Sequence, residues 1–311
     1  MDGIAPSCLV VGAVCGDVIS TGGRTRRAIG GTAFYFSAAF SALGGYAGCV
    51  CKVDEDWMIR EMERSHMPLE GVRRGSCAVY SLEYRGEERD LRLMRHSDRI
   101  LPSDVPPKFW SLEAAHIGPV ESEIDPQIFS AARERFELCT LDVQGLARSF
   151  GRDGRVGLKT RMDRELYAAV SSVDIVKFGE EEALSLLGTP DQWSARAQDF
   201  IELGPRIVIV TLGERGSLLL TSEERHRVPA YRCRVVDPTG AGDCYMAGLV
   251  YRVLKGDEPV QAAHFGSALA SLVIERERPL TFPREGEVLE RMESAGGEIG
   301  SGEADRRDRS A

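Results

Sequence analysis

Short apolar runs alternate with longer helical segments along most of the chain. The runs have few polar positions, which is typical of strands buried within a parallel sheet. They are residues 8–14, 114–120, 138–143, 172–178 and 205–211. The segments with helical character are residues 32–43, 126–135, 245–254 and 259–274. This alternation predicts an α/β architecture in which helices cover a mainly parallel sheet.

A second pattern predicts a smaller sheet. Residues 77–84 and 89–94 alternate apolar and polar positions around a glycine-containing turn, as a hairpin with one polar face does. Residues 21–29 are polar and basic, and they lead into Gly30 and Gly31. Such a basic run is also compatible with a solvated face.

Polar side chains stand where two predicted strands end. Asp17 follows the first strand, and Asp142 and Gln144 stand at the end of the run that begins at Leu138. Open α/β sheets bind ligands outside the carboxyl ends of their strands, so these side chains are candidates for holding a substrate. Formation of a turn is an alternative role for Asp17.

The glycine-rich loop at residues 235–243 is the most informative stretch. Its two leading valines predict a strand or an extended segment, and its glycines let the backbone approach an anion at a helix N-terminus. Asp243 stands at that N-terminus, where an aspartate can serve as a plain N-cap. The nearby oxygen ligands Asp237 and Thr239 favour chemistry instead: Asp243 accepts a proton while the loop amides stabilise a transferred phosphoryl group.

This loop resembles the D-[TP]-x-G-A-G-D signature of the ribokinase-like carbohydrate kinases, the PfkB family. The resemblance implies a central, mainly parallel sheet flanked by helices, with a small β-sheet lid from about residues 18–30 and 76–96. Such a lid excludes water from the reacting phosphate. The implied site roles are a catalytic base at Asp243, an anion hole at Gly240, Ala241 and Gly242, a monovalent-cation site for K⁺ at Asp237 and Thr239, and sugar contacts at Asp17, Gly30 and Gly31.

Three further motifs extend the resemblance. The run from Asp142 to Arg148 is similar to the D-[IV]-Q-x-[LF]-x-R run of the inositol-kinase-like branch, which implies substrate contacts by Asp142, Gln144 and Arg148. Arg148 has an equal alternative as the partner of a structural carboxylate. The family's N-x-x-E becomes Gly179-Glu-Glu-Glu182, which leaves Glu182 to reach Mg²⁺ through water. The implied ATP contacts are Lys177, Thr211, Gly213, Gly216 and Ser267.

One segment departs from the family pattern. Many sugar kinases of the family have G-G-K-G-x-N where this chain has Gly30-Gly31-Thr32-Ala33-Phe34-Tyr35-Phe36. The missing lysine and asparagine make a ribokinase-like or phosphosugar pocket less favourable. The aromatic side chains either pack in the core, which we favour, or face a ring-shaped substrate.

Composition narrows the classes of partner. The 311 residues are 43% hydrophobic, enough for the core of one large domain or two small ones. A formal net charge of −9 disfavours nucleic acid and anionic membranes as the main partner. No apolar run reaches the roughly 18 residues of a spanning helix, so we expect a cytoplasmic protein. The eight cysteines stand mostly alone in apolar segments, which predicts buried, reduced thiols.

We therefore hypothesise a kinase that uses ATP and Mg²⁺ to phosphorylate a sugar or cyclic polyol, with myo-inositol as the first candidate. Residues 1–293 would form the kinase domain, residues 294–311 a disordered tail, and the lid a possible homodimer contact. A nucleoside kinase of the same fold and a non-catalytic small-molecule sensor are the alternatives. Turnover of polyols, turnover of nucleosides, or ligand binding without turnover distinguishes the three.

Overall fold

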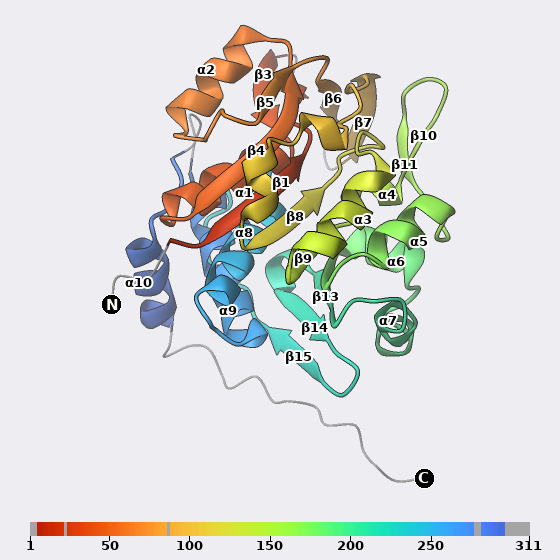
Figure 1. The fold of residues 1–311 in the computed structure, drawn as a ribbon, viewed down its shortest axis with the longest axis vertical. Coiled ribbons are helices and arrows are strands. Elements are labelled where there is room, and N and C mark those ends of the chain that lie inside the picture. Colours follow the sequence, from red (N-terminus) through yellow and green to blue (C-terminus); the bar gives the residue numbers. More distant parts are fainter. Residues whose placement is uncertain (1–4, 22–23, 86–87, 277–280, 296–311) are drawn as a thin grey trace.

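The computed structural model describes residues 5–21, 24–85, 88–276 and 281–295, in which nine strands form the main sheet (Figure 1). These are β1 (Ser7–Gly12), β4 (Tyr46–Val53), β5 (Val72–Arg74), β8 (Ala114–Gly118), β9 (Leu138–Asp142), β12 (Ile175–Gly179), β13 (Ile207–Thr211), β14 (Ser217–Leu220) and β15 (Arg225–Val228). Their order is β15-β14-β13-β12-β9-β8-β1-β4-β5. The strands from β5 to β13 pair in parallel, and β14 and β15 are antiparallel additions.

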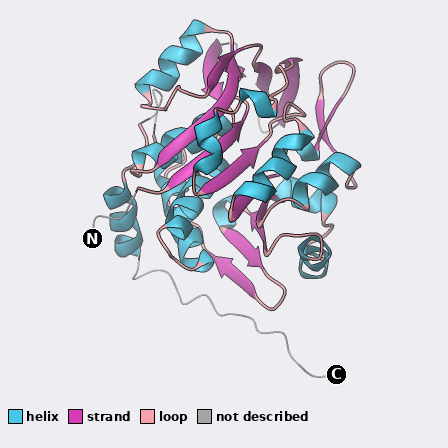
Figure 2. Ribbon diagram, viewed as in Figure 1, coloured by secondary structure: helices cyan, strands magenta, loops and turns pink. Residues whose placement is uncertain are grey.

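Both faces of this sheet are buried, because successive side chains of a strand point to opposite faces. In β1, Cys8 and Val10 pack in one apolar cluster, and Leu9 and Val11 pack in the other. The first cluster includes side chains of α1 (Thr32–Ala42), α2 (Asp56–Arg64), α8 (Ala241–Leu254), α9 (Pro259–Ile274) and α10 (Glu285–Ala295). The second includes α3 (Pro126–Arg135), α4 (Gln144–Ala147), α5 (Arg164–Val170), α6 (Glu180–Leu186) and α7 (Trp193–Ile201). Figure 2 shows the resulting layers, and the predicted α/β fold is confirmed.

The predicted lid is a separate four-stranded mixed sheet. Its strands are β2 (Cys15–Thr21), β3 (Arg24–Gly30), β6 (Ala78–Arg85) and β7 (Glu88–Arg95), in the order β3-β2-β6-β7. Figure 1 shows β3, β6 and β7 at the top of the view, far from β14 and β15 at the bottom.

A further hairpin joins the lid to the main domain. It consists of β10 (Arg148–Phe150) and β11 (Val156–Leu158), which the sequence did not predict. The N–H of Leu93 on β7 donates to the carbonyl of Gly154 in the hairpin turn, with an N–O distance of 2.8 Å. The β10–β11 hairpin therefore contacts the lid at β7.

The predicted helices are confirmed closely, and of the two alternatives predicted for Val235 and Val236, a strand or an extended segment, the strand is not formed. The helix expected from residue 245 begins at Ala241, since the glycine loop turns directly into its first turn. Val235 and Val236 form no strand and are exposed. The N–H groups of Val236 and Asp237 instead donate to the carbonyl of Ile274 at the end of α9.

Several smaller predictions can be compared with the described residues. Phe34 and Tyr35 are fully buried and lie edge to face with Phe282, so their packing in the core is confirmed. All eight cysteines are free, and all except the half-buried Cys233 are buried. None of the described helices is long and apolar enough to cross a membrane. Residues 296–311, in the predicted tail, lie outside the described residues.

Candidate active site

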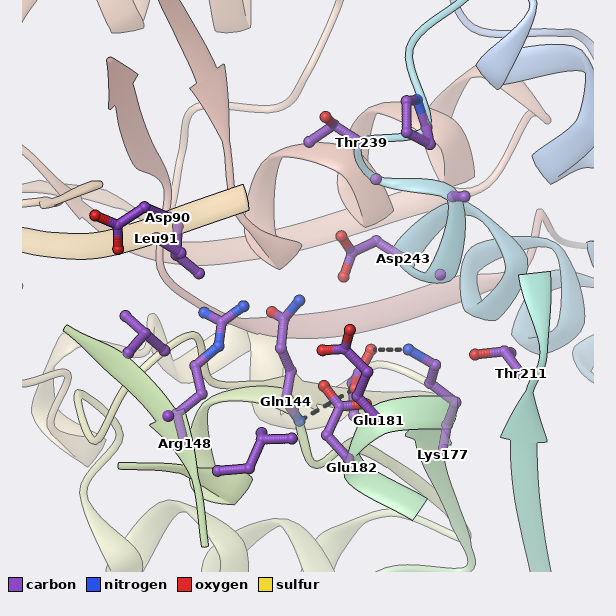
Figure 3. A pocket seen from close by; sticks show the side chains of 18 of the residues that line it. Asp90, Leu91, Gln144, Arg148, Lys177, Glu181, Glu182, Thr211, Thr239 and Asp243 are labelled. Carbon is purple, nitrogen blue, oxygen red and sulfur yellow. Dashed lines mark hydrogen bonds and ion pairs between the residues drawn. The ribbon is translucent and has the colours of Figure 1, made fainter. Parts of the chain in front are cut away.

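The site lies at the edge of the sheet where the carboxyl ends of β9, β12 and β13 meet the N-terminus of α8. A cavity of about 910 Å³ opens there between the sheet edge and the lid. Its lining includes Asp142, Gln144, Arg148, Lys177, Glu181, Glu182, Thr211, Thr239, Gly240, Ala241, Gly242 and Asp243. Figure 3 shows Asp243 pointing into this cavity, with Thr239 above it and Glu181 and Glu182 below. The structure thus brings together most of the residues predicted from sequence.

The glycine loop needs its glycines for geometric reasons. Gly240 has φ 82°, in the left-handed region, and a Cβ there would overlap the ring of Tyr35. A Cβ at Gly242 would lie 2.7 Å from the Nζ atom of Lys177. The loop therefore folds tightly over Lys177 and directs the first N–H groups of α8 toward the cavity, which makes an anion site.

Asp243 has the properties of a general base. Its side chain is only 7% exposed, and its buried Oδ1 atom has no hydrogen-bond partner among the described residues. Burial and, to a smaller extent, the charge of Asp142 raise the pKa of Asp243 to about 6, while Lys177 opposes the rise. A carboxylate with an unused oxygen and a pKa near neutrality is suited to accept a hydroxyl proton.

Lys177 and Asp142 form a buried ion pair beneath the loop. The Nζ atom of Lys177 lies 2.9 Å from Oδ2 of Asp142, while Oδ1 of Asp142 accepts the N–H of Gln144. Burial alone lowers the pKa of Lys177, but Asp142, Glu182 and Asp243 outweigh it, so the pKa is raised and the ammonium stays charged. Asp142 therefore holds Lys177 in place and lines the central cavity, although it does not line the small cavity where Asp17 lies. Its predicted substrate contact stays a prediction.

That small cavity, of about 100 Å³, adjoins the large one and is the candidate acceptor pocket. Its polar lining is Asp17, Gln144, Arg148, Thr239 and Asp243, and its other lining residues are Cys15, Gly31, Tyr35, Tyr80, Leu82, Leu91, Val120 and Gly240. Gly30 does not line it, although a Cβ at Gly30 would overlap the Asp17 carboxylate. We therefore assign Gly30 the role of making room for Asp17.

Arg148 contacts a backbone carbonyl and an aromatic ring of the lid, and its predicted substrate contact stays a prediction. Its Nη1 atom donates to the carbonyl of Val120 at 2.9 Å, and its guanidinium lies 5.5 Å from the ring centroid of Tyr80 on the lid. Tyr80 donates its hydroxyl to the same carbonyl at 2.8 Å. Arg148 therefore lines both cavities while it holds the lid against the loop after β8.

A third cavity, of about 790 Å³, lies on the other side of the glycine loop. It contains the predicted nucleotide residues Thr211, Gly213, Gly216 and Ser267. Its apolar lining includes Tyr231, Val235, Ala270 and Ile274. Ser267 donates its hydroxyl to the carbonyl of Pro229, so it packs α9 against the preceding loop. Lys177 lies outside this cavity, in the central one.

Two carboxylates of α6 are available to a magnesium ion. Glu181 and Glu182 line the central cavity, and burial raises the pKa of Glu182 while Lys177 opposes the rise. The described residues contain no group of three or more His, Cys, Asp or Glu side chains that could enclose an ion. Mg²⁺ commonly uses one or two carboxylates together with waters and phosphate oxygens, so Glu182 fits a water-mediated role.

The monovalent-cation site predicted at Asp237 and Thr239 fits less well. Arg26 of β3 reaches Asp237, with 3.5 Å between Nη2 and Oδ2, and Oδ1 of Asp237 accepts the N–H of Thr239. A guanidinium therefore lies beside this carboxylate, and the K⁺ site stays a prediction.

Sequence reasoning missed the residues that shape the acceptor pocket from distant elements. Leu82 and Leu91 come from the lid, and Arg155 comes from the β10–β11 hairpin into the large cavity. Glu123 is buried and accepts the N–H groups of Ala13, Val120 and Glu121, so it ties the loop after β1 to the loop after β8. Glu123 stands beside Glu121, Ser122 and Asp125, so its local sequence gave no signal of this role.

Comparison with known proteins gives a consistent family. The model of the pfkB family carbohydrate kinases matches residues 152–283. Inositol 3-kinase of Arabidopsis thaliana is 28% identical over 275 residues, which cover 86% of this chain and 73% of that protein.

Two solved structures share the fold. Arabidopsis thaliana ribokinase, complexed with ribose and ATP, has a TM-score of 0.75 and 21% identity, covering 93% of this chain and 99% of that one. A pyrophosphate-dependent myo-inositol-1 kinase, converted into a myo-inositol-3 kinase by replacing an asparagine and a serine with leucine, has a TM-score of 0.73 and 21% identity, covering 94% of this chain and 99% of that one. Residues 152–283 are thus similar to the pfkB family carbohydrate kinases, and the chain has the ribokinase fold.

Proposed function

We propose that this protein transfers the γ-phosphoryl group of ATP to the 3-hydroxyl of myo-inositol. The observation that carries the proposal is the arrangement of the cavities. Asp243 lines both the acceptor pocket and the central cavity, and the glycine loop separates the central cavity from the nucleotide cavity. A donor and an acceptor bound on either side of the loop would meet at Asp243.

The proposed mechanism needs one base and one anion site. Asp243 takes the proton of the acceptor hydroxyl, whose oxygen forms the new bond to the γ-phosphorus. The bond from that phosphorus to the bridging oxygen breaks, and its electron pair leaves with ADP. The N–H groups of Ala241 to Asp243 and the Lys177 ammonium stabilise the negative charge. Glu182 would hold Mg²⁺ through water, and the ion would supply further neutralisation of the phosphates.

The choice of ATP over pyrophosphate rests on the third cavity. Its 790 Å³ falls within the roughly 300–1,000 Å³ of ordinary ligand pockets, and its apolar lining suits an adenosine group. Pyrophosphate would leave this cavity unused.

The choice of acceptor rests on the smallest cavity. About 100 Å³ suits a single ring, and Asp17, Gln144 and Arg148 supply acceptors and donors for hydroxyl groups. A nucleoside kinase needs additional room for a base, which the enclosed Tyr35 does not provide. The inositol 3-kinase relative supports an inositol substrate, and the leucine-converted kinase supports the 3-hydroxyl because Leu82 and Leu91 line this pocket.

The test is a coupled ADP-release assay with ATP and Mg²⁺ over inositols, hexoses, pentoses and nucleosides. We expect turnover of myo-inositol, and a kcat that falls by about 10²- to 10⁴-fold in Asp243→Asn. Binding of ADP to the variant, measured by calorimetry, should stay close to the wild-type value. Turnover of nucleosides alone would support the alternative kinase, and ligand binding without any turnover would support a sensor.

A further inference from the structure

Two buried polar atoms beside the glycine loop have no hydrogen-bond partner among the described residues. They are Oδ1 of Asp243 and Oγ1 of Thr32, which is the first residue of α1. Asp243 lines both the acceptor pocket and the central cavity, whereas Thr32 is fully buried and lines neither. Because Oδ1 of Asp243 is enclosed by protein, Oδ2 is the oxygen better placed to take the proton of an acceptor hydroxyl.

The first turns of α1 and α8 pack against each other, as the neighbouring positions of the two helices in Figure 1 indicate. A Cβ at Gly240 would lie 2.2 Å from the ring of Tyr35, and the Sγ atom of Cys244 lies 4.0 Å from the carbonyl oxygen of Tyr35. Thr32 stands three residues before Tyr35, so the two share a face of α1. Asp243 stands directly before Cys244 on α8. The packing of the two helices therefore brings Thr32 and Asp243 together.

The space around Thr32 is fitted to a short side chain. On β8, a Cβ at Gly118 would lie 2.1 Å from Cγ2 and 2.9 Å from Oγ1 of Thr32, so the strand leaves room for threonine by having no side chain there. Residue 32 is also where the chain departs from the G-G-K-G-x-N pattern. A buried hydroxyl at this place cannot touch a substrate, so any effect of Thr32 on the reaction must pass through a neighbouring group.

The groups that face Asp243 differ in how free they are to serve it. Burial is the main cause of its raised pKa, and the charge of Asp142 adds to the rise. Lys177, the hydroxyl of Thr32 and Arg148 act in the opposite direction, because each favours the charged carboxylate. Lys177 is paired with Asp142 at 2.9 Å, and Arg148 donates to a backbone carbonyl. The Thr32 hydroxyl, by contrast, has no other hydrogen bond among the described residues.

We propose that Thr32 is a positioning residue whose hydroxyl donates a hydrogen bond to Oδ1 of the Asp243 carboxylate, an inference that rests on the base role in the proposed function. This bond satisfies two buried polar atoms at once. It also fixes the rotation of the carboxylate, so that Oδ2 stays turned toward the acceptor hydroxyl. Because the hydroxyl donates to the charged form of Asp243, it keeps the base ionised at a lower pH than burial alone would allow.

Two substitutions separate the hydroxyl of Thr32 from the shape of its side chain. Thr32→Val keeps the shape and removes the donor. We expect the acid limb of its kcat–pH profile to lie about one pH unit above that of the wild type, and its kcat at pH 8.5 to be about 5- to 20-fold lower. The KM values for ATP and myo-inositol should stay within about twofold. Thr32→Ser keeps the donor and should keep the wild-type profile. Ser37→Ala removes another buried, unpartnered hydroxyl of α1, on a different face of the helix, and is the matched control.

The outcomes distinguish a positioning role from a packing role. A Thr32→Val enzyme with the wild-type acid limb would overturn the proposal, and so would a folded Thr32→Ser enzyme as impaired as Thr32→Val, since the methyl group would then be what matters. If Thr32→Val does not fold, a crystal structure of the wild type at pH 8 decides: Oγ1 within about 3.0 Å of Oδ1 supports the bond, and Oγ1 bonded to another atom overturns it. Absence of turnover with every acceptor would instead refute the proposed function.

Discussion

At the scale of single residues, the burial of Asp243 links activity to stability. Its pKa is raised from 3.8 to about 6, so the folded protein holds this proton more tightly than the unfolded chain. The stabilisation from the protonated carboxyl is therefore complete below about pH 4 and is lost as the pH rises through 6. The Asp243 carboxylate can act as a base only above about pH 6, where it is charged. The active form therefore carries a buried charge that opposes folding.

Two measurements follow for Asp243. The plot of kcat against pH should fall on the acid side with an apparent pKa near 6. The free energy of unfolding of Asp243→Asn should exceed that of the wild type by about 1–3 kcal/mol at pH 7.5, because the substitution removes the buried charge. Urea denaturation measures this difference, with the exposed Asp191→Asn as a control. A variant less stable than the wild type would contradict the argument.

The position of Glu182 explains why residue 179 is a glycine where the family motif has an asparagine. A Cβ at residue 179 would overlap the Oε2 atom of Glu182, although the backbone there, with φ −74° and ψ 167°, accepts any side chain. Gly179 thus lets the Glu182 carboxylate fold back over the start of α6. A side chain at residue 179 would displace the Glu182 carboxylate rather than strain the backbone.

We predict that Gly179→Asn lowers activity, even though it restores the family residue. Displacement of Glu182 should raise the Mg²⁺ concentration for half-maximal rate by about threefold or more, and Gly179→Ala should do the same. Initial rates over a Mg²⁺ series check this. Higher activity in the Asn variant would show that Glu182 is free to take another position.

At the scale of elements, the lid and the glycine loop are joined by one ion pair. Arg26 lies on β3, whereas Asp237 precedes α8, and the pair is partly exposed. Exposed pairs contribute about 0.2–1 kcal/mol, so this contact adjusts the loop rather than determining the fold.

We expect wild-type activity to change by less than about twofold when tetramethylammonium replaces K⁺. Arg26→Ala should lower kcat/KM by about two- to fivefold and make the rate respond to K⁺, because the carboxylate loses its cation. Arg24→Ala, on the same strand, is the matched control. A strict K⁺ requirement in the wild type would disprove the substitution of a guanidinium for the ion.

Elements with strong local patterns were predictable, and those held by distant contacts were not. The β strands at 138–142 and 207–211 and the helices at 126–135 and 259–274 follow from apolar runs and periodicity. The β10–β11 hairpin contains three glycines and many polar residues, and its position depends on contact with β7. The pair Val235–Val236 suggested a strand because β-branched residues favour one, but its backbone partner is the end of α9.

The same division applies to the candidate site. Gln144 and Asp243 were predictable because each stands in the first turn of a helix, and Asp17 because it follows the first strand of the main sheet, although it lies inside β2. The pairing of Asp142 with Lys177 was not predictable, because Lys177 lies 35 positions away and belongs to a different strand. Arg26 and Glu123 depend on contacts between segments that are far apart in sequence, which no local pattern encodes.

At the scale of the whole molecule, the cavities proposed for the donor and the acceptor have no lining residue in common. Changes in one cavity should therefore affect one substrate. Ala270→Phe, which fills the apolar wall of the nucleotide cavity, should raise the KM for ATP about tenfold and leave the KM for myo-inositol within twofold. Ala195→Phe, at an exposed position of α7, is the control. Unchanged ATP kinetics would favour a donor that does not use this cavity.

The hydrogen bond between the Leu93 amide and the Gly154 carbonyl also allows lid motion to be measured by hydrogen exchange. A lid that lifts away from the β10–β11 hairpin must break this bond, and a closed lid restores it. The Leu93 amide proton can exchange with solvent deuterium only during the open interval, so its exchange rate counts opening events. Slower exchange with bound substrate would mean that closure is part of the catalytic cycle, and that product release waits for this strand to separate.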